Sequence, residues 1–142
     1  MDVTMIRPIK LYNTRTRSVD PLEPLEEGKV GIYSCGPTVY NYAHIGNLRA
    51  YVFVDTLKRA LQWCGYQTNH VMNITDVGHL TDDASDGEDK MELAAKKSGR
   101  DIWDLSRYYT NVFFEHTGDL GIQPPNTVCR ATDHIKEQID MV

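Results

Sequence analysis

The stretch VGIYSCGPTVYNYAHIGN, from Val30 to Asn47, decides the fold of this chain. Its first four residues are apolar or small, as in a mostly buried strand of a parallel sheet, and Gly36 and Pro37 end that strand. A helix is predicted to begin at Gly46, because apolar residues then recur every three or four positions. The residues between them form a loop that joins a strand to a helix.

The predicted helix runs from Gly46 to about Cys64. Gly65 follows where a left-handed C-cap is expected, and a second strand is predicted from Thr68 to Ile74. Strand, helix and strand make a βαβ unit, whose two strands are expected to be parallel. The helix is expected to bury one face, made of Ala50, Phe53, Val54, Leu57, Ala60, Leu61 and Cys64.

Further elements are predicted on both sides of this unit. Ile9–Asn13 is a short strand candidate. The segment Asp20–Gly28 contains two prolines, three glutamates and a glycine, which is typical of a surface loop. Two helices, Lys90–Ser98 and Asp101–Thr117, are expected with Gly99 between them.

The C-terminal segment is predicted to be a helix that begins near Asp133, with Thr132 or Asp133 as its N-cap. Because it reaches Val142 without a C-cap signal, we expect the chain to end inside this helix. Two parallel strands and one short strand do not bury both faces of an α/β domain. Residues 1–142 are therefore expected to be one part of a larger domain.

Composition limits the class of protein. Hydrophobic residues make up 41% of the chain and charged residues 25%, which is typical of a globular protein and not of a disordered one. The sequence contains no apolar run of membrane-spanning length and no secretory signal pattern, so we expect a cytoplasmic protein with no membrane partner. The net charge of −5 argues against the chain being the main docking surface for a nucleic acid.

An acidic stretch, residues 82–89, superficially suggests a calcium loop through Asp82, Asp86 and Gly87. Aligned on the calcium-loop pattern, however, Ala84 and Leu93 stand where ligands are needed. Calcium is therefore rejected, and no role is assigned to this stretch.

The loop after the first parallel strand carries the residues suited to chemistry. Ligands of open α/β sheets bind at the carboxyl ends of the strands, and a helix N-terminus offers unpaired N–H groups to a phosphate. Gly46 has no Cβ to hinder a close approach. His44 and Asn47 can each donate a hydrogen bond to phosphate oxygens and so stabilise charge as pyrophosphate leaves.

These residues also resemble a known family. His44-Ile45-Gly46-Asn47 looks like the HIGH signature of class I aminoacyl-tRNA synthetases, with asparagine in the fourth place. The residues before it resemble cysteinyl-tRNA synthetases in particular, and the similarity extends from about Leu11 to the end of the chain. The motifs that carry it are Leu11-Tyr12-Asn13-Thr14, Tyr33-x-Cys35-Gly36-Pro37-Thr38-Val39-Tyr40, Asn73-Ile74-Thr75-Asp76 and Arg130-Ala131-Thr132-x-His134-Ile135.

The resemblance implies an α/β fold, the first half of a doubly wound, Rossmann-like parallel sheet. It implies that His44 and Asn47 act in catalysis and that Cys35 and Thr75 contact a substrate cysteine. His79 departs from a commoner acidic stretch and has no assigned role. The expected ATP-binding residues, with magnesium accompanying the nucleotide, are Gly36, Thr38, Tyr40, His44, Gly46 and Asn47.

The resemblance also implies that Cys35 is one of four ligands of a zinc ion that binds the thiolate of the substrate. Thiolate suits zinc better than the hydroxyl of serine does. The other three ligands of the family, a cysteine, a histidine and a glutamate, are expected beyond Val142. Cys64, on the apolar helix face, and Cys129, expected in a loop, are interpreted as structural. Without the resemblance, Cys35 reads as a buried cysteine at a strand end.

The complete enzyme implied by the resemblance activates cysteine with ATP and transfers it to tRNA(Cys). Its phosphate-closing KMSKS loop is absent from this sequence, so the chain alone is expected to be inactive. One alternative is the cysteine-activating ligase of mycothiol synthesis, which is built on the same scaffold. The other is a binding or regulatory module without catalysis.

Overall fold

The computed structural model describes residues 6–77, 95–96, 99 and 101–142. The acidic stretch 82–89 and His79 lie outside these residues, as does most of the predicted helix Lys90–Ser98; its two described residues, Ala95 and Lys96, are helical. None of the helices in the described ranges has the length and hydrophobicity that a membrane crossing requires.

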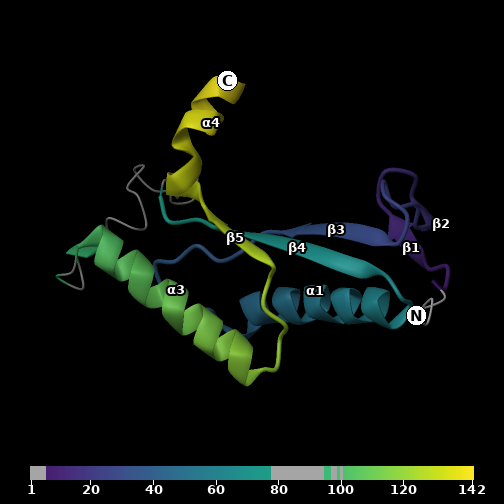
Figure 1. Cartoon of the computed structure of the whole chain (residues 1–142). Coiled ribbons are helices and arrows are strands. Elements are labelled where there is room, and N and C mark those ends of the chain that lie inside the picture. Colours follow the sequence, from purple (N-terminus) through teal and green to yellow (C-terminus); the bar gives the residue numbers. More distant parts are fainter. Residues whose placement is uncertain (1–5, 78–94, 97–98, 100) are drawn as a thin grey trace, which may run out of the picture.

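A parallel sheet of three strands organises the fold, in the order β3 (Lys29–Ser34), β4 (Gln67–Ile74) and β5 (Thr127–Arg130). Helices α1 (Ile45–Trp63) and α3 (Ile102–Asp119) lie along one face of this sheet (Figure 1). The strand, helix and parallel strand predicted from the sequence are therefore confirmed.

Two smaller parts lie outside this layer. A separate antiparallel hairpin is formed by β1 (Lys10–Asn13) and β2 (Ser18–Pro21). The first of these strands was predicted, but the second runs into the segment Asp20–Gly28 that was expected to be loop. After β5 the chain turns through a 3-10 helix, η1 (Ala131–His134), into α4 (Ile135–Met141), which extends away from the sheet in Figure 1.

The strand β3 is half-buried, which corrects the expectation of a mostly buried strand. Val30, Ile32 and Ser34 face the helices, whereas Gly31 and Tyr33 face the other side, where Tyr33 is 65% exposed. Successive side chains of a strand point to opposite faces, so helices on one side bury only every second residue.

The end of α1 follows the prediction closely. Gly65 has a positive φ of 92°. The N–H of Gly65 donates to the Gln62 carbonyl at 3.0 Å, and that of Tyr66 donates to the Leu61 carbonyl at 3.0 Å. These two bonds form a Schellman motif, which satisfies carbonyls that the helix leaves unpaired.

The buried face of α1 differs from the predicted one. Leu61 is buried as predicted, together with Tyr51 and Lys58, which were not predicted. Ala50 and Phe53 of the predicted face are exposed, Phe53 by 70%. Lys58 is only 5% exposed because its amine reaches the Pro124 carbonyl, 2.8 Å away, in the connection before β5. The buried face of α1 is therefore rotated about the helix axis relative to the face predicted from the apolar residues alone.

Candidate functional site

The loop after β3 is held against the end of β4 by a short ladder of hydrogen bonds. The Thr75 N–H donates to the Pro37 carbonyl at 3.0 Å, and the Val39 N–H donates to the Thr75 carbonyl at 3.2 Å. Thr38 and Thr75 form an isolated parallel bridge. The structure thus brings Thr38 beside Thr75 at the carboxyl ends of two neighbouring strands, where ligands of such sheets bind.

Asn73 joins the two sides of this ladder through its side chain. Its Oδ1 accepts the Gly36 N–H at 3.0 Å, and its Nδ2 lies 3.3 Å from the Thr75 Oγ1. A Cβ at Gly36 would lie 1.7 Å from the Asn73 carbonyl oxygen, so only glycine fits at this crossing. The residue after Cys35 is therefore fixed against β4.

The N-terminus of α1 is closed by a capping box made from the two predicted catalytic residues. The Nδ1 of His44 accepts the Gly46 N–H at 3.0 Å, and the Oδ1 of Asn47 accepts the His44 N–H at 3.1 Å. A neutral imidazole that accepts at Nδ1 carries its proton on Nε2. Both side chains therefore cap the helix with an acceptor and keep a donor, Nε2–H of His44 and the amide NH2 of Asn47.

Gly46 contributes to this arrangement. A Cβ built on it would lie 2.8 Å from Cε1 of His44, so the absence of a side chain lets the His44 ring lie over the first turn. The first turn of α1 contains no acidic residue, which leaves the positive end of the helix dipole uncompensated. This combination suits an anion.

A pocket of about 330 Å³ opens between this loop, the start of α1 and α3. Five of the predicted ATP-binding residues line it, namely Gly36, Thr38, Tyr40, His44 and Asn47. Gly46, Cys35 and Thr75 are not among the lining residues. The structure therefore gathers five of the six predicted nucleotide residues around one cavity and leaves Gly46, Cys35 and Thr75 outside its wall.

Three aromatic rings of this region were not identified from the sequence. Tyr42, from the loop, meets Tyr109 of α3 edge to face with ring centroids 5.1 Å apart, and both line the pocket. Tyr51 of α1 also lines the pocket and is buried, and burial raises its pKa to about 12, with a smaller electrostatic contribution from Cys35. Tyr51 therefore remains a neutral phenol. The helical spacing of aromatic residues in the sequence did not indicate which of them line a pocket and which pack in the core.

All three cysteines are free thiols. Cys35 is exposed, so the alternative of a buried cysteine at a strand end is wrong. Cys129 lies within β5, not in a loop, and its Sγ is 3.6 Å from the Met72 carbonyl oxygen. Within the described ranges, no group of three or more histidine, cysteine, aspartate or glutamate side chains is placed to hold a metal ion.

Asp76 holds the chain where it leaves β5. It is 2% exposed, and its carboxylate accepts the Thr132 N–H at 3.1 Å and the Thr132 hydroxyl at 2.6 Å. This corrects the predicted cap of the C-terminal helix, because neither η1 nor α4 has a side-chain N-cap bond from Thr132 or Asp133. Thr132 instead fastens the start of η1 to the end of β4.

The chain is similar to known proteins over most of its length. The profile of the family described as tRNA synthetases class I (C) catalytic domain matches residues 21–142. The chain is 52% identical over 134 residues to a cysteine–tRNA ligase of Treponema denticola, covering 94% of this chain and 27% of the relative. It is 53% identical over 135 residues to a cysteine–tRNA ligase of Burkholderia lata, covering 95% and 29%. The chain thus spans a little more than a quarter of the length of these relatives.

Proposed function

This chain belongs to the family of class I (C) tRNA synthetase catalytic domains, and we propose that it forms the N-terminal half of the catalytic domain of a cysteine–tRNA ligase. Such an enzyme activates cysteine with ATP, releases pyrophosphate and transfers the cysteinyl group to tRNA(Cys). The observation that carries the proposal is the capping box of His44 and Asn47. Both residues line the pocket between the loop after β3, the start of α1 and α3, which we call the loop pocket.

The proposed role of the pocket is to hold ATP, bound with magnesium, by its phosphates. His44 Nε2–H and the Asn47 amide lie beside the N-terminus of α1, where the positive end of the helix dipole also favours an anion. When cysteine attacks the α-phosphate, negative charge increases on the phosphate oxygens. Donors fixed by a capping box need little reorganisation at that moment, so they favour the transition state over the bound substrate.

The proposed cysteine subsite lies at the strand ends, with Cys35 and Thr75 contacting the amino acid. Cys35 fits a zinc ligand by its chemistry, because it is an exposed thiol at a sheet edge. A tetrahedral site needs three more ligands, which we propose come from outside the described residues. Bound zinc would supply a Lewis acid for the thiolate of the substrate.

We propose that the enzyme acts in the cytoplasm and binds tRNA(Cys) mainly through parts other than residues 1–142. The net charge of −5 supports this division, because phosphate contacts require clustered lysine and arginine.

The test uses the complete ligase that contains these residues and separates capping from catalysis. His44→Asn keeps a side-chain acceptor for the Gly46 N–H, but its shorter amide does not extend to the position of the Nε2 donor, whereas His44→Ala loses both groups. Single-turnover cysteine activation at saturating ATP is expected to fall about 10²–10³-fold in both variants. The affinity for cysteine, measured separately, is expected to change far less.

An activation rate that His44→Asn leaves intact would show that the side chain only caps the helix. The matched isostere Asn47→Asp keeps the acceptor for the His44 N–H and removes the NH2 donor, so it is expected to slow activation as well. If the variants of His44 and Asn47 weakened only cysteine binding and left the activation rate unchanged, the assignment of this pocket to phosphate chemistry would be wrong.

A further inference from the structure

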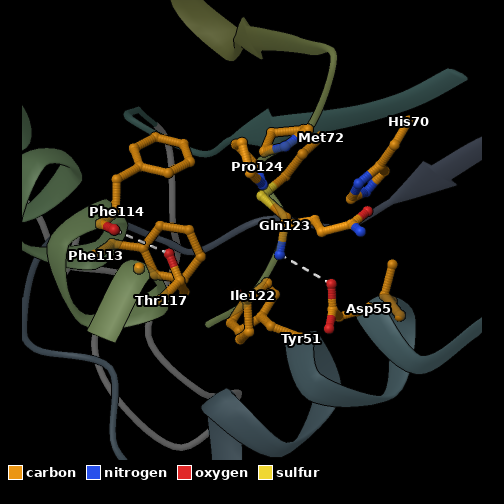
Figure 2. A pocket seen from close by; sticks show the side chains of 13 residues that line it. Tyr51, Asp55, His70, Met72, Phe113, Phe114, Thr117, Ile122, Gln123 and Pro124 are labelled. Carbon is orange, nitrogen blue, oxygen red and sulfur yellow. Dashed lines mark hydrogen bonds between the residues drawn. The ribbon is translucent and has the colours of Figure 1, made fainter. Parts of the chain in front are cut away.

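Asn73, near the end of β4, lies on the face of the sheet opposite to the helices. Figure 2 shows His70 and Met72 extending from β4 toward α1 and α3. Because successive side chains of a strand alternate between the two faces, the side chain of Asn73 extends to the other face. It is half-buried there and contacts the loop after β3 on one side and Thr75 on the other.

The orientation of the Asn73 amide follows from its two partners. The Gly36 N–H can only donate, so the amide atom 3.0 Å from it is the oxygen, Oδ1. The amide nitrogen Nδ2 then faces the Thr75 Oγ1, 3.3 Å away, and donates to it. A hydroxyl group has a single proton, and it does not direct that proton at a donor. The proton of the Thr75 hydroxyl therefore points away from Asn73.

The backbone of Thr75 is engaged with the loop. Its N–H donates to the Pro37 carbonyl, and its carbonyl accepts the Val39 N–H. The hydroxyl is therefore the one hydrogen-bond donor that Thr75 has left for a ligand. The direction of this donor depends on Asn73, because the amide nitrogen occupies the opposite side of the hydroxyl oxygen.

The same side chain also fixes the residue that follows Cys35. The loop lies so close to β4 that a Cβ on Gly36 would be 1.7 Å from the Asn73 carbonyl oxygen. The Gly36 N–H is held by the Asn73 Oδ1 at this crossing. One amide group thus joins the backbone beside Cys35 to the hydroxyl of Thr75.

We propose that Asn73 is a positioning residue of the cysteine subsite. It holds Cys35 and Thr75 in a fixed relation to each other, and it directs the hydroxyl proton of Thr75 toward an acceptor atom of the bound amino acid. The inference rests on the proposed function, which assigns Cys35 and Thr75 to the substrate. Asn73 acts through these two residues and does not itself contact cysteine.

The first test is Asn73→Asp in the complete ligase that contains these residues. Aspartate keeps an acceptor for the Gly36 N–H but replaces the amide donor by a second acceptor, to which the Thr75 hydroxyl can donate. The hydroxyl proton then turns away from the substrate. The equilibrium affinity for cysteine is expected to fall about tenfold, the worth of one net hydrogen bond, with little change in the affinity for ATP.

The matched control is Asn69→Asp, which adds the same charge at an exposed position on the same face of β4. It is expected to leave the affinity for cysteine unchanged. An equal loss of affinity in the two aspartate variants would show a general effect of charge and would overturn the inference.

A double-mutant cycle with Thr75→Val tests whether Asn73 acts through the hydroxyl. Thr75→Val alone is expected to weaken cysteine binding about tenfold, and Asn73→Asp should add little to that loss. If the two losses add in full, or if Asn73→Asp alone has no effect, this inference is wrong and the cysteine subsite stands. A Thr75→Val variant with unchanged cysteine affinity would instead overturn the subsite, and the inference with it.

Asn73→Ala tests the link to Cys35, because alanine also loses the bond to the Gly36 N–H. The preference for cysteine over serine in the activation step is expected to decrease in Asn73→Ala and to be retained in Asn73→Asp. An unchanged preference in Asn73→Ala would show that Asn73 does not position Cys35. Should Asn73→Asp not fold, Asn73→Ser, which is too short to span both partners, takes its place in the cycle.

Discussion

Tyr51 of α1 and Phe113 of α3 pack edge to face, with ring centroids 4.8 Å apart and an interplanar angle of 71°. Both rings are buried, and with Met72 of β4 they form a core cluster. The same two rings line both the pocket at the loop after β3 and a second pocket, of about 350 Å³, between α1, β4 and α3. One aromatic contact therefore supports the packing of the two helices on the sheet and contributes to the walls of two cavities.

Replacing Phe113 by alanine is expected to lower the free energy of unfolding by about 3–5 kcal/mol, because a large buried ring leaves a cavity. Phe53→Ala on α1 is the matched control, since that ring is exposed and its loss should cost less than about 0.5 kcal/mol. Urea unfolding of the chain measures both. Similar losses in the two variants would mean that the helix face predicted from apolar periodicity, which includes Phe53, is the buried one after all.

Gly36→Ala is expected to destabilise the chain by about 2 kcal/mol or more, because the new methyl group meets the Asn73 carbonyl and the backbone must move. Gly31→Ala is the comparison within the same strand and loop region. A Cβ at Gly31 has no atom within 4 Å, so this substitution should be neutral or slightly stabilising. Denaturant midpoints of the two variants test the close approach of the loop to β4, and a harmless Gly36→Ala would refute it.

The tie between Asp76 and Thr132 is expected to be worth more than an ordinary surface contact. Asp76→Ala should cost about 2–3 kcal/mol, since it removes a buried carboxylate and leaves the N–H of the half-buried Thr132 without its acceptor. Asp104→Ala, which removes an exposed carboxylate from α3, should cost well under 1 kcal/mol. In a double-mutant cycle, Asp76→Ala and Thr132→Val should be non-additive. Additive losses would show that the two side chains do not interact.

His70 should make stability depend on pH. Burial lowers its pKa below the ordinary 6.5, so the unfolded chain binds a proton at higher pH than the folded chain. The free energy of unfolding is then complete above about pH 6.5 and decreases as the pH falls from there through the folded pKa, by about 1.4 kcal/mol for each unit of depression.

Two measurements check this dependence. NMR titration of the His70 ring gives its folded pKa directly, and urea unfolding between pH 5 and 8 compares the chain with His70→Gln. The variant should lose part of the acid sensitivity. A His70 pKa at or above 6.5 would contradict the burial argument.

Much of the fold is predictable from the sequence, because some elements carry local signals. Gly65 is placed where only a positive φ completes the Schellman motif of α1. The strand β4 and the helix α3 were expected to within about two residues at each end. In each case the stop signal and the periodicity lie within the element itself.

Other features of the fold depend on contacts between residues far apart in the sequence, and the sequence did not indicate these features. β5 has only four residues and is defined by its pairing with β4, from Val71–Thr127 to Ile74–Arg130. Lys58 enters the buried face of α1 only because it binds the Pro124 carbonyl, 66 residues away. A lysine among periodic apolar residues is expected to be exposed when its hydrogen-bond partner is not known.

The sequence indicated part of the geometry of the candidate site, and the roles assigned to its residues stay predictions. The motif around His44 indicated a phosphate loop, and five of its residues do line one pocket. That His44 and Asn47 also cap the helix was not foreseen, because histidine and asparagine replace the usual serine or threonine and glutamate of a capping box. The role of Asn73 could not be read from sequence, since it depends on the approach of Gly36 in three dimensions.

The burial of Lys58 has a consequence for its chemical reactivity. An amine reacts with acylating reagents only when it is uncharged and accessible. Burial lowers the pKa of Lys58, which favours the uncharged form. The Pro124 carbonyl and the surrounding chain, however, block access to the amine. Acylation of Lys58 then requires that the connection between α3 and β5 open first. The labelling rate at Lys58, compared with that at the exposed Lys136, would therefore report how often this connection opens in the native protein.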